Sequence, residues 1–226
     1  MTTKCRPIIM SSDSVRAILD GRKCQTRRII KPQPTIGKEG YYSDFSPYPD
    51  STAYWYERAE IDKDGEMYPG KKVFGVSSED GEEGHVCPFG APGDRLWVRE
   101  AWCQCEVGHC YQADDVTREC PSSRDYKKSP MFMPRKYSRL TLEITSVRCE
   151  RVQEITEDDC FAEGIIVNEF SEVRYYSRKP NSHLYVVPKN AFGGMWDEIN
   201  GKKQGYSWKD NPWVWILEFK VFNKGE

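Results

Sequence analysis

The 226-residue sequence predicts an α+β protein, a small mixed β-barrel with a few short helices and large loop insertions. Residues 139–150 alternate between apolar and polar side chains, which is typical of a strand with one buried face. Residues 213–222 begin apolar on both faces, as expected for a strand in a closed barrel or in a sheet covered by a helix. Because no strand–helix–strand unit repeats, a barrel is favoured over a layered parallel sheet.

The N-terminal segment predicts a strand, a helix and a second strand. Residues 7–10 are suited to a short strand, and the serines that follow are good helix N-caps. Apolar side chains at helical spacing then predict a helix over 13–20, ended by Gly21. Alternation predicts a strand that runs to Ile30 and is stopped by Pro32.

The later core elements follow from similar signals. Residues 94–102 predict a strong strand after a turn. Thr156, with an acid three residues on, predicts the start of a helix that ends at Gly164. An amphipathic helix is expected over 189–200, before the C-terminal strand.

The whole chain, 1–226, is interpreted as one domain with three insertions. They lie at about 35–86, 103–134 and 167–188, where prolines, glycines and irregular patterning interrupt the core elements. Two aromatic or β-branched runs in the first insertion, 53–56 and 72–76, predict hairpin strands.

Charge limits the classes of function. The chain has 33 Lys and Arg residues against 35 Asp and Glu residues, a formal net charge of −2, so a basic surface must be local. Residues 16–31 supply such a patch, with six basic side chains against Asp20 alone. The patch is compatible with two interpretations. It could bind nucleic acid or phosphate at the rim of a site, or it could be the solvated edge of a strand. No apolar run reaches the ~18 residues of a membrane helix and no signal peptide is apparent, so a cytoplasmic protein is expected.

The nine cysteines are expected to be free thiols, because their number is odd and no export signal accompanies them. A Cys/His-rich segment leaves zinc as an alternative, but its CxC and HC spacings differ from the CxxC pairs of zinc sites. We therefore expect no metal and no cofactor. The segment comprises Cys103, Cys105, His109, Cys110 and Cys120, with His85 and Cys87 upstream.

Several segments in fixed order resemble the ASCH domain, a branch of the PUA-like β-barrel superfamily. They are VRAILDGRKCQTRRIIKPQP, CPFGAPGDRLWVREAW, RLTLEITSVRCERVQEITEDDCFAEGI, MWDEINGK and NPWVWILEFK. The resemblance covers about half of the chain and is strongest to the longer ASCH-type proteins of bacteriophages and prophages. It implies a PUA-like barrel, and a host-cell cytoplasmic location if the protein is phage-encoded.

The resemblance also implies a site. Small bacterial ASCH enzymes are amidohydrolases that remove the acetyl group from N4-acetylcytidine. Their lysine and threonine correspond to Lys23 and Thr26 in the block after Gly21. Their glutamate corresponds best to Glu163, with Glu157 and Asp159 as the alternatives. Lys23 and Thr26 are three residues apart and would face opposite sides of a regular strand. They can cooperate only if Lys23 lies in the turn and Thr26 begins the strand.

Three functions are compatible with this pattern. The first is a pocket for a nucleobase or nucleotide at the candidate catalytic residues, with hydrolysis of a base-linked amide. In it, Arg22, Arg27 and Arg28 would bind the nucleotide or nucleic acid and favour a neutral lysine. The second is a non-catalytic RNA- or DNA-binding module, and the third is a protein-binding accessory factor. The sequence specifies neither the substrate nor the oligomeric state.

Overall fold

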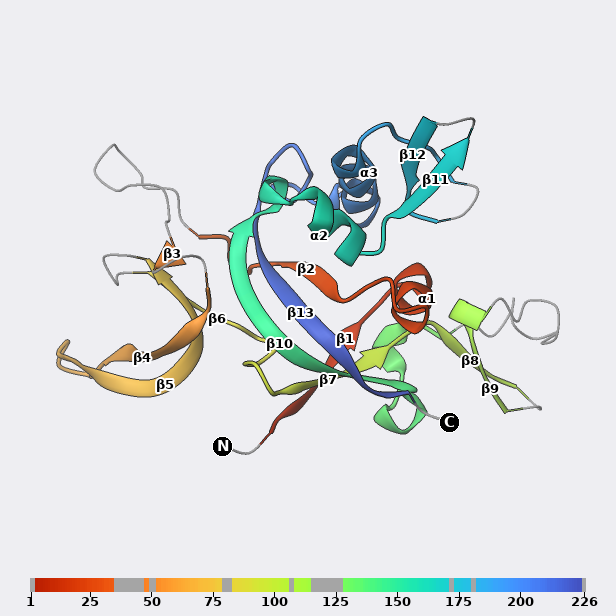
Figure 1. Cartoon of the computed structure of the whole chain (residues 1–226). Helices are drawn as coiled ribbons and strands as arrows, with labels where there is room; N and C mark the ends of the chain where they lie inside the picture. The colour runs from red at the N-terminus through yellow and green to blue at the C-terminus, as the bar shows by residue number, and fades with distance from the viewer. Residues whose placement is uncertain are drawn as a thin grey trace.

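The computed structural model describes most of the chain (Figure 1). The described residues are 3–34, 47–48, 52–78, 83–105, 108–114, 128–170, 173–179 and 182–224. Within them the fold is α+β, mostly strands with three α-helices, which confirms the predicted class. In these ranges no helix has the length and apolar character needed to cross a membrane.

The central feature is a five-stranded sheet in the order β1-β7-β10-β13-β2. β1 runs parallel to β7, and the other neighbours are antiparallel. Register shifts in the long β10–β13 ladder accompany the strong curvature of these two strands in Figure 1. The five strands are β1 (Cys5–Ile9), β2 (Gln25–Ile29), β7 (Arg95–Arg99), β10 (Leu140–Arg151) and β13 (Trp213–Lys224).

All three predicted helices are present. They are α1 (Ser12–Leu19), α2 (Glu157–Ala162) and α3 (Pro188–Asn200). The Ser11 side chain caps α1 by accepting from the backbone N–H of Ser14. Thr156 and Asp159 form the predicted capping box of α2, in which each side chain accepts from the other residue's backbone N–H. The caps therefore set where both helices begin.

β13 is buried on both faces because a separate hydrophobic core covers each face. Trp215 and Leu217 pack into the larger core with residues of β1, β7, β10 and α1. Val214 and Ile216 point the other way, into a second core formed with α2 and α3. The two-faced apolar pattern predicted from the sequence thus reflects a sheet with a core on each side.

The sheet does not close into a barrel, which corrects the sequence-based prediction. β1 and β2 are its two edges, and no backbone ladder joins them in the described part of the chain. Instead, the guanidinium of Arg28 on β2 donates to the carbonyl oxygen of Ile9 on β1 at 2.6 Å. The prediction failed because burial on both faces of a strand is compatible with either architecture.

Each predicted insertion contains a separate small sheet. The predicted hairpin is present as β4 paired with β5, and β3 and β6 add to β5. Two further hairpins, β8–β9 and β11–β12, occur where irregular loops were expected. The bounds are β3 (Pro47–Tyr48), β4 (Tyr54–Ile61), β5 (Met67–Ser78), β6 (Gly84–Val86), β8 (Trp102–Cys105), β9 (Gly108–Tyr111), β11 (Ile166–Phe170) and β12 (Val173–Ser177).

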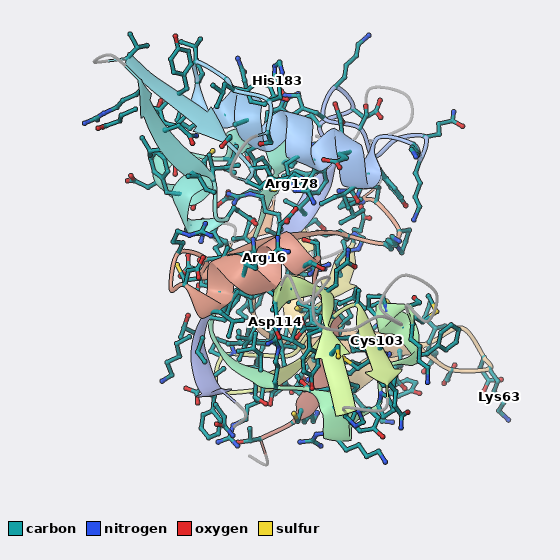
Figure 2. The ribbon with its side chains drawn as sticks, turned by 90° about the vertical axis from the view of Figure 1, so that its right-hand side faces the viewer. Arg16, Lys63, Cys103, Asp114, Arg178 and His183 are labelled. Atoms are coloured by element: carbon teal, nitrogen blue, oxygen red, sulfur yellow. The ribbon has the colours of Figure 1, made fainter. Side chains whose placement is uncertain are left out.

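Helix α1 connects the two halves of the molecule. Figure 2 shows it between the β8–β9 hairpin below and the α3, β11 and β12 layer above. Arg16 donates to the carbonyl oxygen of Ala113 at 2.6 Å, and Asp13 forms an ion pair with Arg178 at 3.1 Å. These contacts fix the helix whose C-terminal turn leads into the candidate site.

Candidate functional site

A pocket of about 880 Å³ lies along β2, between the α2–α3 layer and the β6 segment. Its walls include Lys23, Thr26, Arg27, Arg28 and Glu163. The structure therefore brings five of the six predicted site residues to one cavity. The sixth, Arg22, is not part of the pocket wall; it forms an ion pair with Asp20 at 2.8 Å.

The turn after α1 places Lys23 ahead of the strand. Gly21 adopts a φ of +74°, a left-handed conformation that glycine reaches without steric cost. The backbone N–H groups of Arg22 and Lys23 then both donate to the carbonyl oxygen of Ala17. Thr26 is the second residue of β2. This is the arrangement that cooperation between Lys23 and Thr26 requires.

Glu163 reaches the pocket from the end of α2. It is the C-cap residue of that helix, and Gly164 follows with a φ of +97°. A Cβ atom on Gly164 would lie 3.1 Å from the Cβ of Ala17 and 3.5 Å from that of Lys23. The missing side chain thus allows the end of α2 to approach the turn that carries the lysine.

Lys23 and Glu163 form a buried ion pair. The lysine Nζ lies 2.6 Å from Glu163 Oε2 and 2.8 Å from the carbonyl oxygen of the same residue. Each side chain is only 3% exposed. Burial lowers the pKa of Lys23; the carboxylate of Glu163 opposes this effect, and the cations Arg28 and Arg27 add to it. The site therefore favours the neutral amine more than solvent does.

Arg27 is part of the framework behind this pair. Its side chain is 1% exposed, and its guanidinium contacts Asp159 at 2.8 Å and Glu163 at 3.4 Å. Burial alone would raise the pKa of Asp159. Hydrogen bonding from Gln25 and the charge of Arg27 outweigh burial and lower that pKa to about 2. Arg27 therefore orients carboxylates and is not accessible to a nucleic-acid phosphate.

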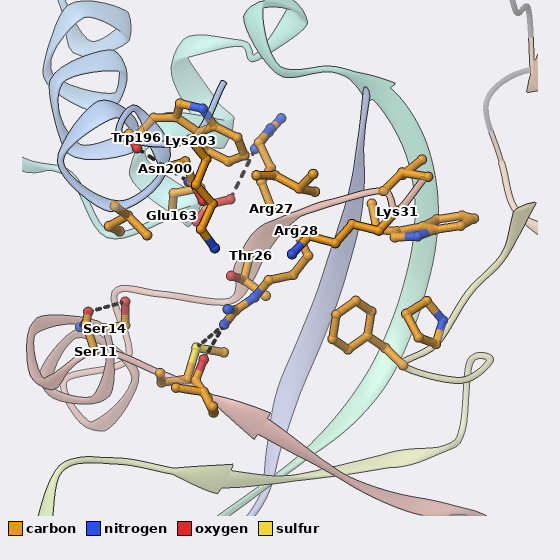
Figure 3. A pocket seen from close by; sticks show the side chains of 18 of the residues that line it. Ser11, Ser14, Thr26, Arg27, Arg28, Lys31, Glu163, Trp196, Asn200 and Lys203 are labelled. Carbon is orange, nitrogen blue, oxygen red and sulfur yellow. Dashed lines mark hydrogen bonds and ion pairs between the residues drawn. The ribbon is translucent and has the colours of Figure 1, made fainter. Parts of the chain in front are cut away.

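Arg28 has a different environment from its neighbour. One terminal nitrogen donates to the carbonyl oxygen of Ile9, and no carboxylate lies within 4 Å of the guanidinium in the described ranges. Its Nε is buried without a hydrogen-bond acceptor. Figure 3 shows this side chain beside Thr26 at the centre of the pocket. A cation with an unused donor in a pocket wall is suited to bind an anionic or carbonyl oxygen.

Several pocket residues were not predicted. Lys31 belongs to the basic patch, but Arg58 and His85 come from the first insertion and Lys203 follows α3. Aromatic walls are provided by Phe89 and by other rings from the strands and helix, Phe192, Trp196 and Trp215. No local motif links these distant residues, so only the tertiary structure could reveal them.

A second buried carboxylate, Glu100, lies outside the pocket. Arg139 contacts its two oxygens at 2.8 and 3.0 Å, and Asp114 binds the same guanidinium. Burial raises the pKa of Glu100, and the pairing with Arg139 opposes that rise. This cluster joins the end of β7 to the start of β10 and has a structural role.

The cysteine-rich segment forms no metal-binding cluster in the described residues, where no three His, Cys, Asp or Glu side chains are grouped suitably. Cys103 and Cys110 face each other across the β8–β9 hairpin. Cys120 and the side chain of Cys105 lie outside the described residues, so the expectation of no metal stays a prediction. Cys5, Cys24, Cys87, Cys149 and Cys160 are free thiols.

No protein-family model matches the chain, and no curated protein or solved structure shows significant similarity to it.

Proposed function

We propose that the chain is an ASCH-type protein of the PUA-like superfamily that binds a nucleobase or nucleotide and hydrolyses a base-linked amide. N4-acetylcytidine is the model substrate. The observation that carries this proposal is the buried Lys23–Glu163 pair in the same pocket wall as Thr26. The three residues were selected by motif resemblance, and they converge although Glu163 is distant in the sequence.

The hydrogen bonds of Lys23 suit a base that activates the threonine. A neutral amine has two N–H bonds and one lone pair. Both N–H bonds are directed to Glu163, one to its carboxylate and one to its carbonyl oxygen. No hydrogen bond joins Lys23 to Thr26 among the described residues, so the lone pair can take the hydroxyl proton of Thr26 only when the bound substrate brings the two side chains together. The threonine oxygen then attacks the amide carbonyl carbon.

The rest of the reaction balances without a cofactor. The attack forms a bond between Thr26 Oγ1 and the carbonyl carbon and gives a tetrahedral oxyanion. Its collapse breaks the C–N bond, and the amine leaves with the proton carried from Lys23 through Glu163. Water then hydrolyses the acyl ester on Thr26, so one amide and one water yield an amine and a carboxylic acid.

Arg28 and the aromatic walls provide binding. The unused Nε donor of Arg28 is suited to a substrate oxygen, and Phe89 and Trp196 offer apolar surfaces for a base. Arg28 therefore acts in orientation, whereas Lys23, Thr26 and Glu163 act in bond cleavage.

A turnover assay tests this function. Wild type and the variants Thr26→Ala, Lys23→Ala and Glu163→Gln are assayed on N4-acetylcytidine and related acylated nucleosides. Each variant should lose most of the activity, and the Lys23/Thr26 double variant should be little worse than either single variant, because the residues act as a unit. Thr145→Ala, on an exposed part of β10 outside the pocket, is the matched control.

Two outcomes contradict the proposal. Nucleotide binding by wild type without turnover on any acylated nucleoside would favour the non-catalytic binding module. Activity that survives Lys23→Ala would exclude the proposed base even if the reaction class were right.

A further inference from the structure

Four basic side chains line the pocket without a carboxylate partner. In the described ranges, none of them has an Asp or Glu oxygen within 4 Å, whereas Lys23 and Arg27 are both paired. Among the described residues that line the pocket, Glu163 is the one acidic residue, and it is already paired with Lys23. We call these four side chains the basic track. They are Arg28, Lys31, Arg58 and Lys203.

The basic track extends well beyond the candidate catalytic residues. Arg28 and Lys31 lie on and just after β2, Lys203 follows α3, and Arg58 comes from β4 in the first insertion. Figure 3 shows Lys31 and Lys203 reaching into the pocket from opposite walls. The insertion and the core therefore contribute charge to one continuous surface.

Local structure supports the positions of two of these side chains. A β-bulge in β5 sets Gly70 and Lys71 opposite the single residue Arg58 of β4, and bulges redirect side chains next to binding sites. The Nζ of Lys31 lies 5.7 Å from the ring centre of Tyr206, so an aromatic ring supports it in place of a carboxylate.

The charge of the basic track exceeds what one nucleoside monophosphate can neutralise. A nucleoside has no phosphate and a nucleoside monophosphate has one, but four cations converge on this pocket in a chain of net charge −2. A ligand that carries several anionic groups would offset their mutual repulsion and be bound in preference to one with a single phosphate. The cavity volume of about 880 Å³ also lies near the upper end of the ~300–1,000 Å³ typical of small-ligand pockets.

We propose that the pocket binds a single strand of nucleic acid, with its phosphates on the basic track and one base at Lys23, Thr26 and Glu163. The placement of that base rests on the proposed function. A paired base in a duplex cannot reach side chains that are 3–5% exposed, which favours a single strand. Phe89 supplies a half-buried aromatic surface for a neighbouring base.

Salt-dependent binding tests the proposal. Fluorescence anisotropy is measured with unmodified, labelled single strands of about ten nucleotides, as RNA and as DNA, because such grooves cover ~4–16 nucleotides. Lys31→Ala, Arg58→Ala and Lys203→Ala should each reduce the slope of log K against log salt by ~0.7, and the triple variant by about 2. All three residues are exposed, so the fold should be retained, which a thermal melt verifies.

Lys63→Ala is the matched control, because Lys63 is exposed at the tip of the β4–β5 hairpin (Figure 2) and does not line the pocket. It should leave the slope unchanged. Binding of RNA, of DNA or of both supports the proposal and identifies the strand. A strand that binds no more tightly than a nucleoside monophosphate, or equal slope losses in Lys63→Ala and the track variants, overturns it.

The readout separates this proposal from the proposed function. Strand binding with the expected slopes but without amide hydrolysis supports the basic track and contradicts the catalytic function. Hydrolysis of free N4-acetylcytidine without strand binding supports the catalytic function and contradicts the basic track.

Discussion

The ammonium of Lys23 and the carboxylate of Glu163 lie 2.6 Å apart, and each side chain is 3% exposed. The other carboxylate oxygen faces Arg27 at 3.4 Å. A buried pair of this kind is maintained by its partners rather than by solvent. Substitution of either partner should therefore change the stability of the fold, the pKa of the lysine where it remains and the rate of catalysis, and each effect can be measured separately.

The first prediction concerns stability. Lys23→Met leaves Glu163 buried with Arg27 alone and should lower the free energy of unfolding by about 3 kcal/mol. The double variant with Glu163→Gln should lose at least ~1 kcal/mol less than the sum of the single changes. Urea unfolding of the four proteins in this cycle measures the coupling. Strict additivity would show that the pair contributes no interaction energy.

The second prediction concerns the pH dependence of turnover. Since Lys23 must be neutral, kcat/KM should rise with pH, with a midpoint below the ordinary lysine pKa because burial lowers it. The negative charge of Glu163 opposes that shift, so the residual activity of Glu163→Gln should show a still lower midpoint. A midpoint that moves upward in this variant contradicts the assignment of the base.

The third prediction concerns acid stability. The pKa of Asp159 is about 2 in the folded protein and ~3.9 in an unfolded chain, so its stabilisation is complete above about pH 4 and is lost as the pH falls towards 2. Asp159→Asn should lower the free energy of unfolding by about 2 kcal/mol at neutral pH and converge with wild type near pH 2. Asp158→Asn, an exposed neighbour, is the control. Urea unfolding across this pH range measures the difference.

The fourth prediction concerns the close approach at Gly164. Its φ of +97° disfavours any side chain, and an alanine there would also crowd Ala17 and Lys23. Gly65 has a φ of +86° with open space around it, so Gly65→Ala isolates the conformational cost of ~1–2 kcal/mol. Gly164→Ala should cost more than this control and should also reduce turnover. Equal unfolding energies in the two variants would disprove the packing argument.

The fifth prediction separates two arginines of the basic patch. Arg28→Ala should weaken nucleoside monophosphate binding by roughly tenfold to a hundredfold, because a hydrogen bond to a charged group contributes ~1.5–3 kcal/mol. Arg22→Ala should have no effect on that binding, because Arg22 is paired with Asp20 and does not line the pocket. Isothermal titration calorimetry on both variants measures the difference, and equal losses would place the phosphate elsewhere.

Much of the core could be predicted because its signals are local. The serine cap before α1, the capping box of α2 and the alternation along β10 each depend on neighbouring residues. The β8–β9 and β11–β12 hairpins were missed because their short strands lack a clear apolar alternation and pair across brief connections. The sequence did not show that β1 and β2 remain unpaired edges of the sheet. Whether a sheet closes into a barrel depends on where its edge strands lie in space, and the periodicity of the sequence does not contain that information.

The candidate site was predictable only in part, for a related reason. Motif resemblance selected Lys23, Thr26 and Glu163, and the structure brings them to one pocket. Arg27 and Arg28 looked equivalent in the sequence. Adjacent strand residues point to opposite faces, so one joins the carboxylates behind the pocket and the other faces its interior. The sequence pattern alone does not show which of the two arginines faces the pocket interior.

The pairing of β2 has a consequence for how the protein folds. In the described part of the sheet β2 pairs with β13 alone, and Ile29 lies opposite Val214, a separation of 214 minus 29, or 185 residues. Contacts between such distant segments form slowly, because the intervening chain must first be brought together. The hairpins can form from neighbouring residues, but the wall that carries Thr26 and Arg28 cannot. The pocket should therefore mature in the slowest, least local step of folding.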